Sequence, residues 1–239
     1  MRRLKTSFWF AICITVSLLM LAESTVGQSI AVQAKKGDLA QMPIENVMLE
    51  EEGIVQLLSR FSFVYNIPVG LEVARGDDQS SIYRIEFKKG TLSDLFTQFV
   101  TEHKEYSWKI EDGVITVFPK EDYRDPILRE LLKTKIRSFS VPEKTTTMMF
   151  GEKLLSSPEI ERILDLYGLT YDTGYIGGFY IQQLGQQYSF HASNAELRSI
   201  LNKVIKESPV GQNWVISNDT SARKLSLRVN VRLEYSQKL

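Results

Sequence analysis

The residues able to carry out acid–base or metal chemistry are few and widely separated in this sequence. The only histidines are His103 and His191, and neither has the second histidine four residues away that a helical zinc motif uses. His103 is expected to end a helix, where a cation favours the helix dipole. His191 is expected to follow a strand. We predict structural or surface roles for both and no metal site.

Other candidate motifs are also incomplete. The serines of "GEKLLSS" (151–157) and "SFHAS" (189–193) lack the G-x-S-x-G pattern of a nucleophile elbow. The acidic run 50–52 is predicted to begin a helix, where carboxylates stabilise the helix dipole. A glycosidase site would need a second carboxylate across a cleft, so we favour the structural interpretation. "GYIGG" (174–178) lacks phosphate-loop spacing. The sequence therefore predicts no catalytic residue, no cofactor and no enzyme.

The N-terminus has the pattern of an export signal. Three basic residues within the first five positions precede an apolar run, 8–21, and small residues follow it. We predict a signal peptide over 1–27 and a periplasmic location, the alternatives being a secreted protein or an uncleaved membrane anchor. The only cysteine, Cys13, lies inside the apolar run, so the mature chain would contain no disulfide. That composition suits a bacterial envelope better than a disulfide-rich extracellular setting.

Charge and composition exclude some partners. The 239 residues include 29 basic and 29 acidic side chains, and removing 1–27 leaves 26 against 28, a net charge of about −2. This balance does not predict binding to nucleic acid or to an anionic membrane. The hydrophobic fraction of 43% and the charged fraction of 24% are typical of a globular protein.

Helical stripes recur about one hundred residues apart. One amphipathic stripe comprises Leu92, Leu95, Phe96, Phe99 and Val100, and an offset of 105 gives Leu197, Ile200, Leu201, Val204 and Ile205. An earlier stripe comprises Ile54, Leu57, Leu58 and Phe61, and an offset of 106 gives Ile160, Ile163, Leu164 and Tyr167. Capping boxes are expected at Thr91 or Ser93 with Asp94, and at Ser193 with Glu196.

Strand signals follow the same order in both copies. A strand ending in Phe precedes each later helix, "YRIEF" (83–87) and "QYSF" (187–190), and a tryptophan strand follows it, "YSWKI" (106–110) and "NWVIS" (213–217). A closing strand then follows, after "DG" (112–113) in the first copy, which predicts a tight hairpin. We interpret this order as an internal duplication of a β-α-β-β-α-β-β plan.

The predicted fold class is therefore α+β, with two related small modules, each of two helices packed on a mostly antiparallel sheet. The expected boundaries are 40–119 for the first module, 120–136 for a linker and 137–239 for a divergent second module. Asp125 as N-cap and Pro126 at the first helical position predict a short linker helix.

The segments 47–73 and 85–119 resemble the short N-terminal domain shared by secretins and TonB-dependent receptors. The resemblance depends on a helix ending in "LLSRFSFVYNI", on "GTLSDLF" after an apolar strand, and on an aromatic strand followed by "DG" and "ITVFP". It implies a periplasmic docking module that binds another protein of the envelope and has no enzymatic activity. The second copy matches more loosely, and the sequence contains no run of strands that predicts an outer-membrane barrel.

The final strand, 225–235, alternates apolar and polar residues over about 11 positions, longer than an ordinary strand. One interpretation is a sheet strand with one face in water. The other is an edge that extends beyond its neighbours and accepts a partner strand. Under this second hypothesis Arg228, Asn230 and Arg232 lie at the partner-binding surface, and Lys88 is a further candidate.

We therefore expect an exported, non-enzymatic docking or adaptor protein of the cell envelope. One alternative is a small-ligand binding protein whose inter-module cleft has aromatic walls, formed by Tyr171, Tyr175, Phe179, Tyr180 and Trp214. The other is an enzyme of unrecognised type, which would need a buried Glu or His with a perturbed pKa in a cleft.

Overall fold

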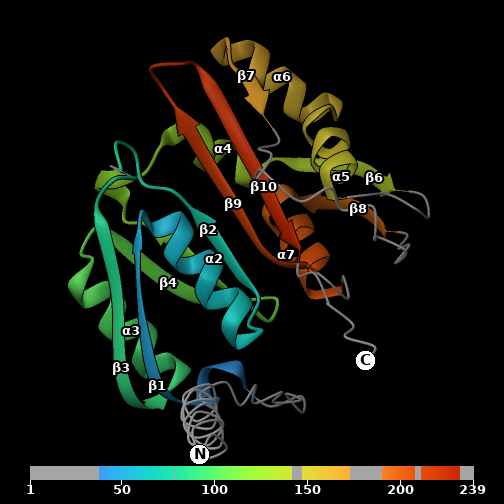
Figure 1. Cartoon of the computed structure of the whole chain (residues 1–239). Helices are drawn as coiled ribbons and strands as arrows, with labels where there is room; N and C mark the ends of the chain where they lie inside the picture. The colour runs from blue at the N-terminus through green and yellow to red at the C-terminus, as the bar shows by residue number, and fades with distance from the viewer. Residues whose placement is uncertain (1–37, 78, 142–146, 173–189, 208–210, 232–239) are drawn as a thin grey trace, which may run out of the picture. The chain divides into compact units, whose positions relative to one another are not determined.

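The chain has an α+β fold, as predicted from its sequence (Figure 1). The computed structural model describes residues 38–77, 79–141, 147–172, 190–207 and 211–231, which belong to one compact unit. Among them, no helix has the length and apolar character needed to cross a membrane. The predicted signal peptide and "GYIGG" lie outside the described residues.

Two halves follow each other along the chain. The elements of the first half are η1 (Leu39–Gln41), β1 (Pro43–Glu52), α2 (Ile54–Tyr65), β2 (Val69–Glu72), β3 (Ile82–Thr91), α3 (Leu92–Glu102), β4 (Tyr106–Glu111) and β5 (Val114–Pro119). The linker contains η2 (Glu121–Tyr123) and α4 (Pro126–Lys133). The elements of the second half are β6 (Lys135–Val141), α5 (Thr147–Leu155), α6 (Pro158–Tyr167), β7 (Thr170–Asp172), β8 (Phe190–Glu196), α7 (Leu197–Glu207), β9 (Gly211–Asp219) and β10 (Lys224–Val231).

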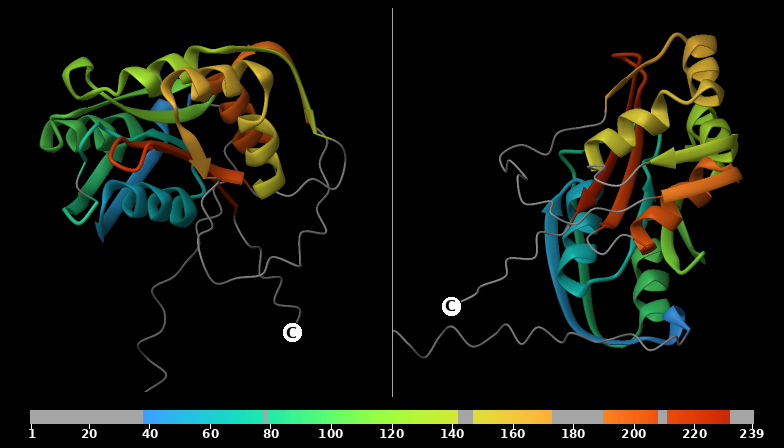
Figure 2. Two further views of the ribbon diagram at one scale, coloured as in Figure 1. Left: turned by 90° about the horizontal axis from the view of Figure 1, so that it is seen from above. Right: turned by 90° about the vertical axis from the view of Figure 1, so that its right-hand side faces the viewer.

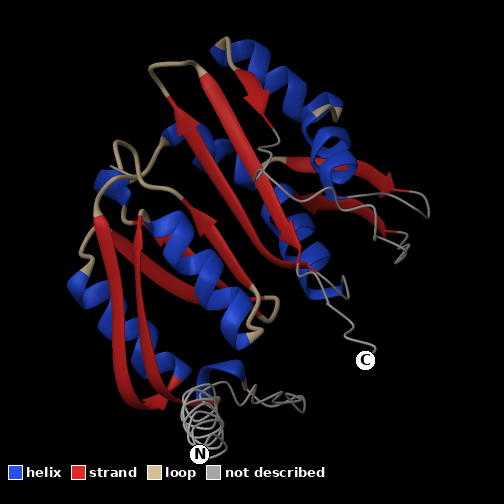
Figure 3. Ribbon diagram, viewed as in Figure 1, coloured by secondary structure: helices blue, strands red, loops and turns tan. Residues whose placement is uncertain are grey.

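The same strand pairings occur in both halves of the chain. In the first half β1 pairs with β3, and the other strands run in the order β4-β5-β2. In the second half β6 pairs with β8, and the order β9-β10-β7 repeats the same antiparallel and parallel pairings. Each half therefore divides its strands between two sheets, where one sheet for each module was expected. The three-stranded parts join through parallel pairing of β2 with β9 into one six-stranded sheet (Figure 3).

Equivalent backbone hydrogen bonds recur in the two halves. The Leu92 N–H donates to the Met42 carbonyl at 2.9 Å, and the Leu197 N–H donates to the Thr134 carbonyl at 2.9 Å. The two donors, Leu92 and Leu197, are 105 residues apart. The two acceptors, which come just before the first strand of each half, are 92 residues apart (42 to 134). Such shared irregular bonds are stronger evidence of duplication than amphipathic spacing, which many helices have.

The offset predicted for the first helix pair was wrong by one helical turn. The C-cap residues of α2 and α6 are Asn66 and Gly168, both in the left-handed conformation that closes helices, so the offset is 102 rather than 106 (66 to 168). Phe61 therefore corresponds to Ile163 rather than Tyr167, and both Phe61 and Ile163 are buried. An apolar stripe repeats with each turn, so spacing alone could not distinguish the two registers.

A second register also differs from prediction. Glu111 and Asp219 end β4 and β9 at their hairpins, and the residues five positions earlier are Tyr106 and Trp214. Both side chains are fully buried, whereas Trp108 is partly exposed. Tyr106, rather than Trp108, is therefore the counterpart of Trp214.

Local signals succeeded where they were complete. Thr91 and Asp94 form a capping box at α3, Asp125 caps α4 ahead of Pro126, and Asp112 and Gly113 form a two-residue hairpin turn with positive φ.

Two other local predictions were wrong because the preceding strand extends further than expected. Ser193 and Glu196 lie within β8, which begins at Phe190 instead of ending there, so they form no capping box. The acidic run 50–52 ends β1, and the N-cap of α2 is Gly53.

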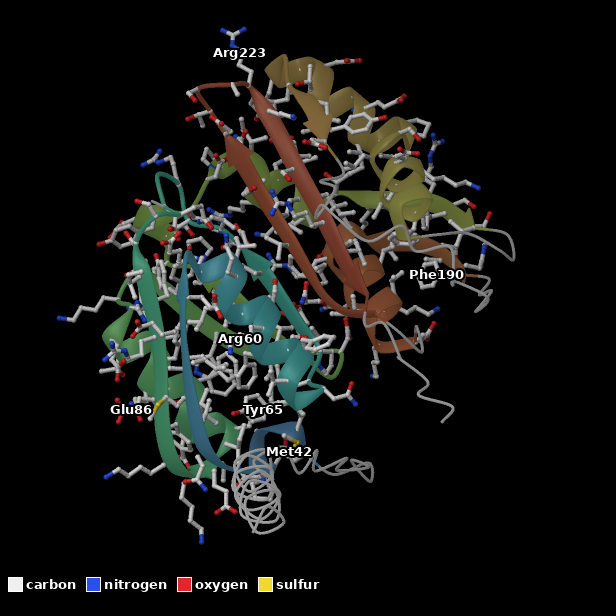
Figure 4. All side chains as sticks on the ribbon, in the orientation of Figure 1. Met42, Arg60, Tyr65, Glu86, Phe190 and Arg223 are labelled. Atoms are coloured by element: carbon white, nitrogen blue, oxygen red, sulfur yellow. The ribbon has the colours of Figure 1, made fainter. Side chains whose placement is uncertain are left out.

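Each half has its own hydrophobic core. α2 and α3 cover the first core, which also receives Val215 from β9. The second core contains α4 to α7 and receives Val114 from β5. The additional helix α5 occupies the ten extra residues between β6 and α6 (offset 102 against 92), and its Phe150 packs on Phe139 and Phe190 with ring centroids 5.2 and 6.0 Å apart. Figure 4 labels Phe190 at the start of β8.

Candidate functional site

The two histidines occupy structural positions on different elements. His103 is the C-cap residue of α3, as predicted, and its ring packs against Tyr83 and Phe99 with centroids 4.8 and 4.6 Å apart. His191 is exposed on β8. Across the described parts of the chain, no group of three or more His, Cys, Asp or Glu residues is placed to hold a metal ion.

The serines and the acidic run also have structural surroundings. Ser156 and Ser157 lie between α5 and α6 and donate to backbone carbonyls at 3.2 and 2.7 Å, so they are not aligned with a base. The acidic run 50–52 lines an open depression of about 430 Å³ with Gln56 and Ile82. Two of its carboxylates form ion pairs, Glu50 with Arg84 and Glu51 with Arg60, which Figure 4 labels on α2. Arginine-paired carboxylates at the surface are ordinary solvated charges.

A tyrosine–aspartate cluster fixes the chain after β2. The buried Tyr106 hydroxyl donates to the Asp77 carboxylate and accepts the Ala74 N–H at 3.0 Å. Tyr83 donates to the same carboxylate at 3.1 Å. Burial, followed by the nearby Asp77 charge, raises the pKa of Tyr106 well above its ordinary value of 10.0. The cluster therefore connects the segment that follows β2, which contains Ala74 and Asp77, to Tyr83 of β3 and Tyr106 of β4.

We expect Tyr106 to make the protein sensitive to alkali. Above pH 10 the unfolded chain ionises this tyrosine while the folded chain keeps it protonated, so its contribution to stability is present below that pH and is lost as the pH rises further. Tyr106→Phe should therefore cost about 1–3 kcal/mol at neutral pH, because the Ala74 N–H loses its acceptor. It should also give a shallower fall in stability above pH 10. Urea unfolding at several pH values measures both, and parallel pH profiles for variant and wild type would contradict the assignment.

The junction of the halves is closely packed. Val69–Glu72 of β2 pair in parallel with Asn213–Ile216 of β9. A Cβ placed on Gly70 would lie 2.3 Å from the Trp214 ring, so only glycine fits beneath the indole. The Trp214 Nε1–H donates to the Asn202 amide oxygen at 2.8 Å, which satisfies its buried donor.

A buried ionic network also crosses the junction. Glu72 is fully buried and accepts two hydrogen bonds from Arg124 of the linker, each 2.7 Å long. Arg198 of α7, with a side chain 10% exposed, donates to Glu72 at 3.0 Å. The hydrogen bonding to Glu72 raises the pKa of Arg124 above its ordinary value. One carboxylate therefore holds together β2, the linker and the second half.

Among the described residues, β10 is paired with another strand along the whole of one edge and along only part of the other, and α5 also contacts β10. It pairs with β9 along its length, but it pairs with β7 only over Lys224–Ser226 (Figure 2). Beyond Ser226, no strand in the described part of the chain lies on that side of Leu227–Val231. β10 ends at Val231 among the described residues, so the extension to 235 remains a prediction.

The backbone of β10 shows which groups face the open edge. The Thr170 N–H of β7 donates to the Arg223 carbonyl at 3.0 Å, and in a parallel ladder the N–H two residues further on faces the same edge. By alternation, the N–H groups of Leu227 and Val229 face it too. The Val73 N–H donates to the Ile216 carbonyl, so the neighbouring Val215 faces β10, where its partner is Arg228. Both observations show that the backbone N–H and C=O groups of the polar positions 226, 228 and 230 face β9.

The structure separates the four predicted partner-binding residues. Arg228 is half-buried on β10, on the face shared with Val215. Asn230 pairs with Asn213 through the backbone. Lys88 is exposed on β3, in a different sheet, and Arg232 lies outside the described residues. The outward groups of Leu227 and Val229 were missed because they belong to the backbone of apolar residues.

The aromatic residues predicted to line a cleft are not brought together among the described residues. Trp214 is fully buried against Gly70, and Tyr171 is exposed on β7. Tyr175, Phe179 and Tyr180 lie outside the described residues.

The fold defines an α+β protein whose two halves share the same strand pairings, with a β10 edge that the described residues pair only in part. No family model matches the chain, and no curated protein matches it. Membership of the secretin and receptor domain family therefore remains a prediction from the sequence pattern.

Proposed function

We propose that this chain is an exported, non-enzymatic docking protein that binds another protein of the bacterial envelope. Its binding element is the open edge of β10, where a strand of the partner adds to the sheet. The observation that carries the proposal is the outward-facing backbone of Leu227 and Val229, beside which the described residues place no strand. Strand addition gains its affinity from such main-chain groups.

The charge next to this edge supports recognition of a specific partner. Arg228 lies between Leu227 and Val229 and is the one charged side chain in that stretch. A cation beside an open edge disfavours pairing with arbitrary apolar strands. It favours a partner strand that carries a carboxylate.

Photo-crosslinking in cells tests the proposal directly. A probe at Arg228 should capture one envelope protein, identified by mass spectrometry, and a probe at Lys88 on the separate β1–β3 sheet serves as the comparison. Capture at Arg228 alone assigns the interface to β10. Blanks at both positions in the native envelope would overturn the proposal.

A proline at Val229 is the matching disruption. Val229→Pro removes an outward N–H, and losing one to two main-chain bonds of about 1–1.5 kcal/mol should reduce capture at Arg228 roughly tenfold. Val229→Ala keeps the N–H and should retain capture. Asn230→Pro, the position favoured by the sequence pattern alone, removes a donor that faces β9 and should destabilise the hairpin itself. Equal capture by Val229→Pro and Val229→Ala would show that this edge is not the interface.

A further inference from the structure

The outer edge of β4 carries backbone groups that no strand among the described residues pairs with. The Lys120 N–H donates to the Glu105 carbonyl at 2.8 Å, so Glu105 faces β5, and every second residue after it does the same by alternation. The N–H and C=O groups of Trp108 and Ile110 therefore face away from β5. β4 is the first strand in the order β4-β5-β2-β9-β10-β7, and the described part of the chain places no strand beyond it.

The corresponding edge of the second half is occupied. Glu111 and Asp219 end β4 and β9 at their hairpins, so Ile216 of β9 is the counterpart of Trp108. The Val73 N–H, just after β2, donates to the Ile216 carbonyl at 3.0 Å, and β2 pairs with β9 in parallel. Ile216 is fully buried there, whereas Trp108 is partly exposed. The junction therefore shows, within the same chain, what kind of strand covers this edge.

We propose that the edge of β4 binds an extended segment of another protein, which pairs with β4 in parallel as β2 pairs with β9. The contacts begin at Trp108, because the Tyr106 N–H already donates to the His103 carbonyl at 3.0 Å. Main-chain bonds to Trp108 and Ile110 then supply affinity in the way that strand addition does elsewhere. β5, β2 and β9 separate β4 from β10, so binding here does not require a partner at β10.

The side chains of β4 define the chemistry of the bound segment, because directly opposite residues of neighbouring strands lie on the same face of a sheet. Trp108 and Ile110 are partly exposed and pack against the first core, so the residues opposite them are apolar. Lys109 lies between them on the other face, with a side chain 43% exposed and an ion pair to Glu111 at 2.9 Å. A carboxylate opposite Lys109 is attracted to it, whereas a cation there is repelled.

The bound segment therefore has the order apolar, acidic, apolar. A lysine in the middle of an open edge discourages pairing with strands that carry no acidic residue. It also disfavours a second copy of this chain at the same edge. Antiparallel pairing of Trp108 with Ile110 between two molecules would place Lys109 of one directly opposite Lys109 of the other.

Disulfide tethering of synthetic peptides provides the test, since Cys13 is the only native cysteine and can be replaced by Ser. Ser107→Cys supplies the protein thiol, and the capped peptide CVEVT brings its cysteine opposite that thiol when its valines pair with Trp108 and Ile110 in parallel. Neighbouring strands lie about 4.8 Å apart, within the Cα separation that a disulfide spans. In glutathione buffer, the equilibrium constant for the mixed disulfide should be about fivefold higher for CVEVT than for CVKVT.

Control proteins separate the edge from the charge. Tethering of CVEVT to Ser107→Cys should be about tenfold stronger than to Glu102→Cys on α3, which offers no strand edge. Adding Lys109→Met should remove the preference for CVEVT over CVKVT, and Lys109→Glu should reverse it. The peptide TVEVC, whose cysteine meets Ser107→Cys only in antiparallel pairing, should tether less than CVEVT.

Three results would refute the proposal. The first is equal tethering of CVEVT and CVKVT to Ser107→Cys. The second is tethering of CVEVT no stronger than that to Glu102→Cys. The third is a yield with TVEVC that equals or exceeds the yield with CVEVT, because the segment would then not pair in parallel.

Discussion

Gly70→Ala is expected to destabilise the protein by about 3 kcal/mol, a large loss for a single methyl group. The added Cβ would lie 2.3 Å from the Trp214 ring, and neither the indole nor the paired strand can move without breaking the junction. Overpacking of a rigid core typically costs about 1–3 kcal/mol, and here the contact lies inside a sheet ladder. Urea unfolding monitored by tryptophan fluorescence measures the change.

Gly76→Ala is the matched control for this substitution. No atom lies within 4 Å of a Cβ at Gly76, although its φ of +76° adds strain of about 1 kcal/mol. The Gly70 variant should therefore lose clearly more stability than the Gly76 variant. Equal losses would mean that Trp214 does not pack against β2 as described.

Glu72→Gln should be comparably damaging, with an expected loss of about 3–5 kcal/mol. The substitution keeps the shape of the side chain but removes the carboxylate that accepts hydrogen bonds from Arg124 and Arg198, and Glu111, 3.9 Å from Arg198, remains as a weaker partner. Because those arginines belong to the linker and to α7, the second half should separate from the first at lower denaturant concentration. Urea unfolding followed by far-UV circular dichroism measures both the midpoint and any separate transition.

Two variants test whether charge compensation is the cause. Glu159→Gln breaks an ion pair with Arg137, whose side chain is 85% exposed, and should cost much less. Adding Arg198→Met to Glu72→Gln removes one uncompensated charge and should recover part of the loss. If the double variant loses more free energy of unfolding than the two single variants lose together, the network does not act through charge.

Several features could be read from the sequence because their signals are local. The capping box of Thr91 and Asp94, the linker helix that begins at Pro126, and the hairpin at Asp112 and Gly113 each need residues only a few positions apart. The repeated order of helices and strands in the two halves was also visible in the sequence. Export, the envelope partner and the family resemblance were inferred from the sequence and remain predictions.

The correspondence of residues between the two halves and the pairing of strands could not be predicted from such local signals. An apolar stripe is unchanged by a shift of one turn, so the pairing of Phe61 with Ile163 became clear only from the helix ends. Aromatic identity suggested Trp108 as the counterpart of Trp214, although burial at the hairpin selects Tyr106. The division of each half between two sheets also depends on contacts distant in sequence.

The sequence by itself determined the α+β class, the repeated order of elements and most helix positions, since these follow from local spacing and turn chemistry. The tertiary structure alone decided that β2 and β9 merge the halves into one sheet and that the backbone of Leu227 and Val229 faces the edge of β10 that no described strand pairs with. The physical reason is that strand pairing uses backbone groups, which every residue carries. Only the fold determines which of those groups face another strand and which face outward.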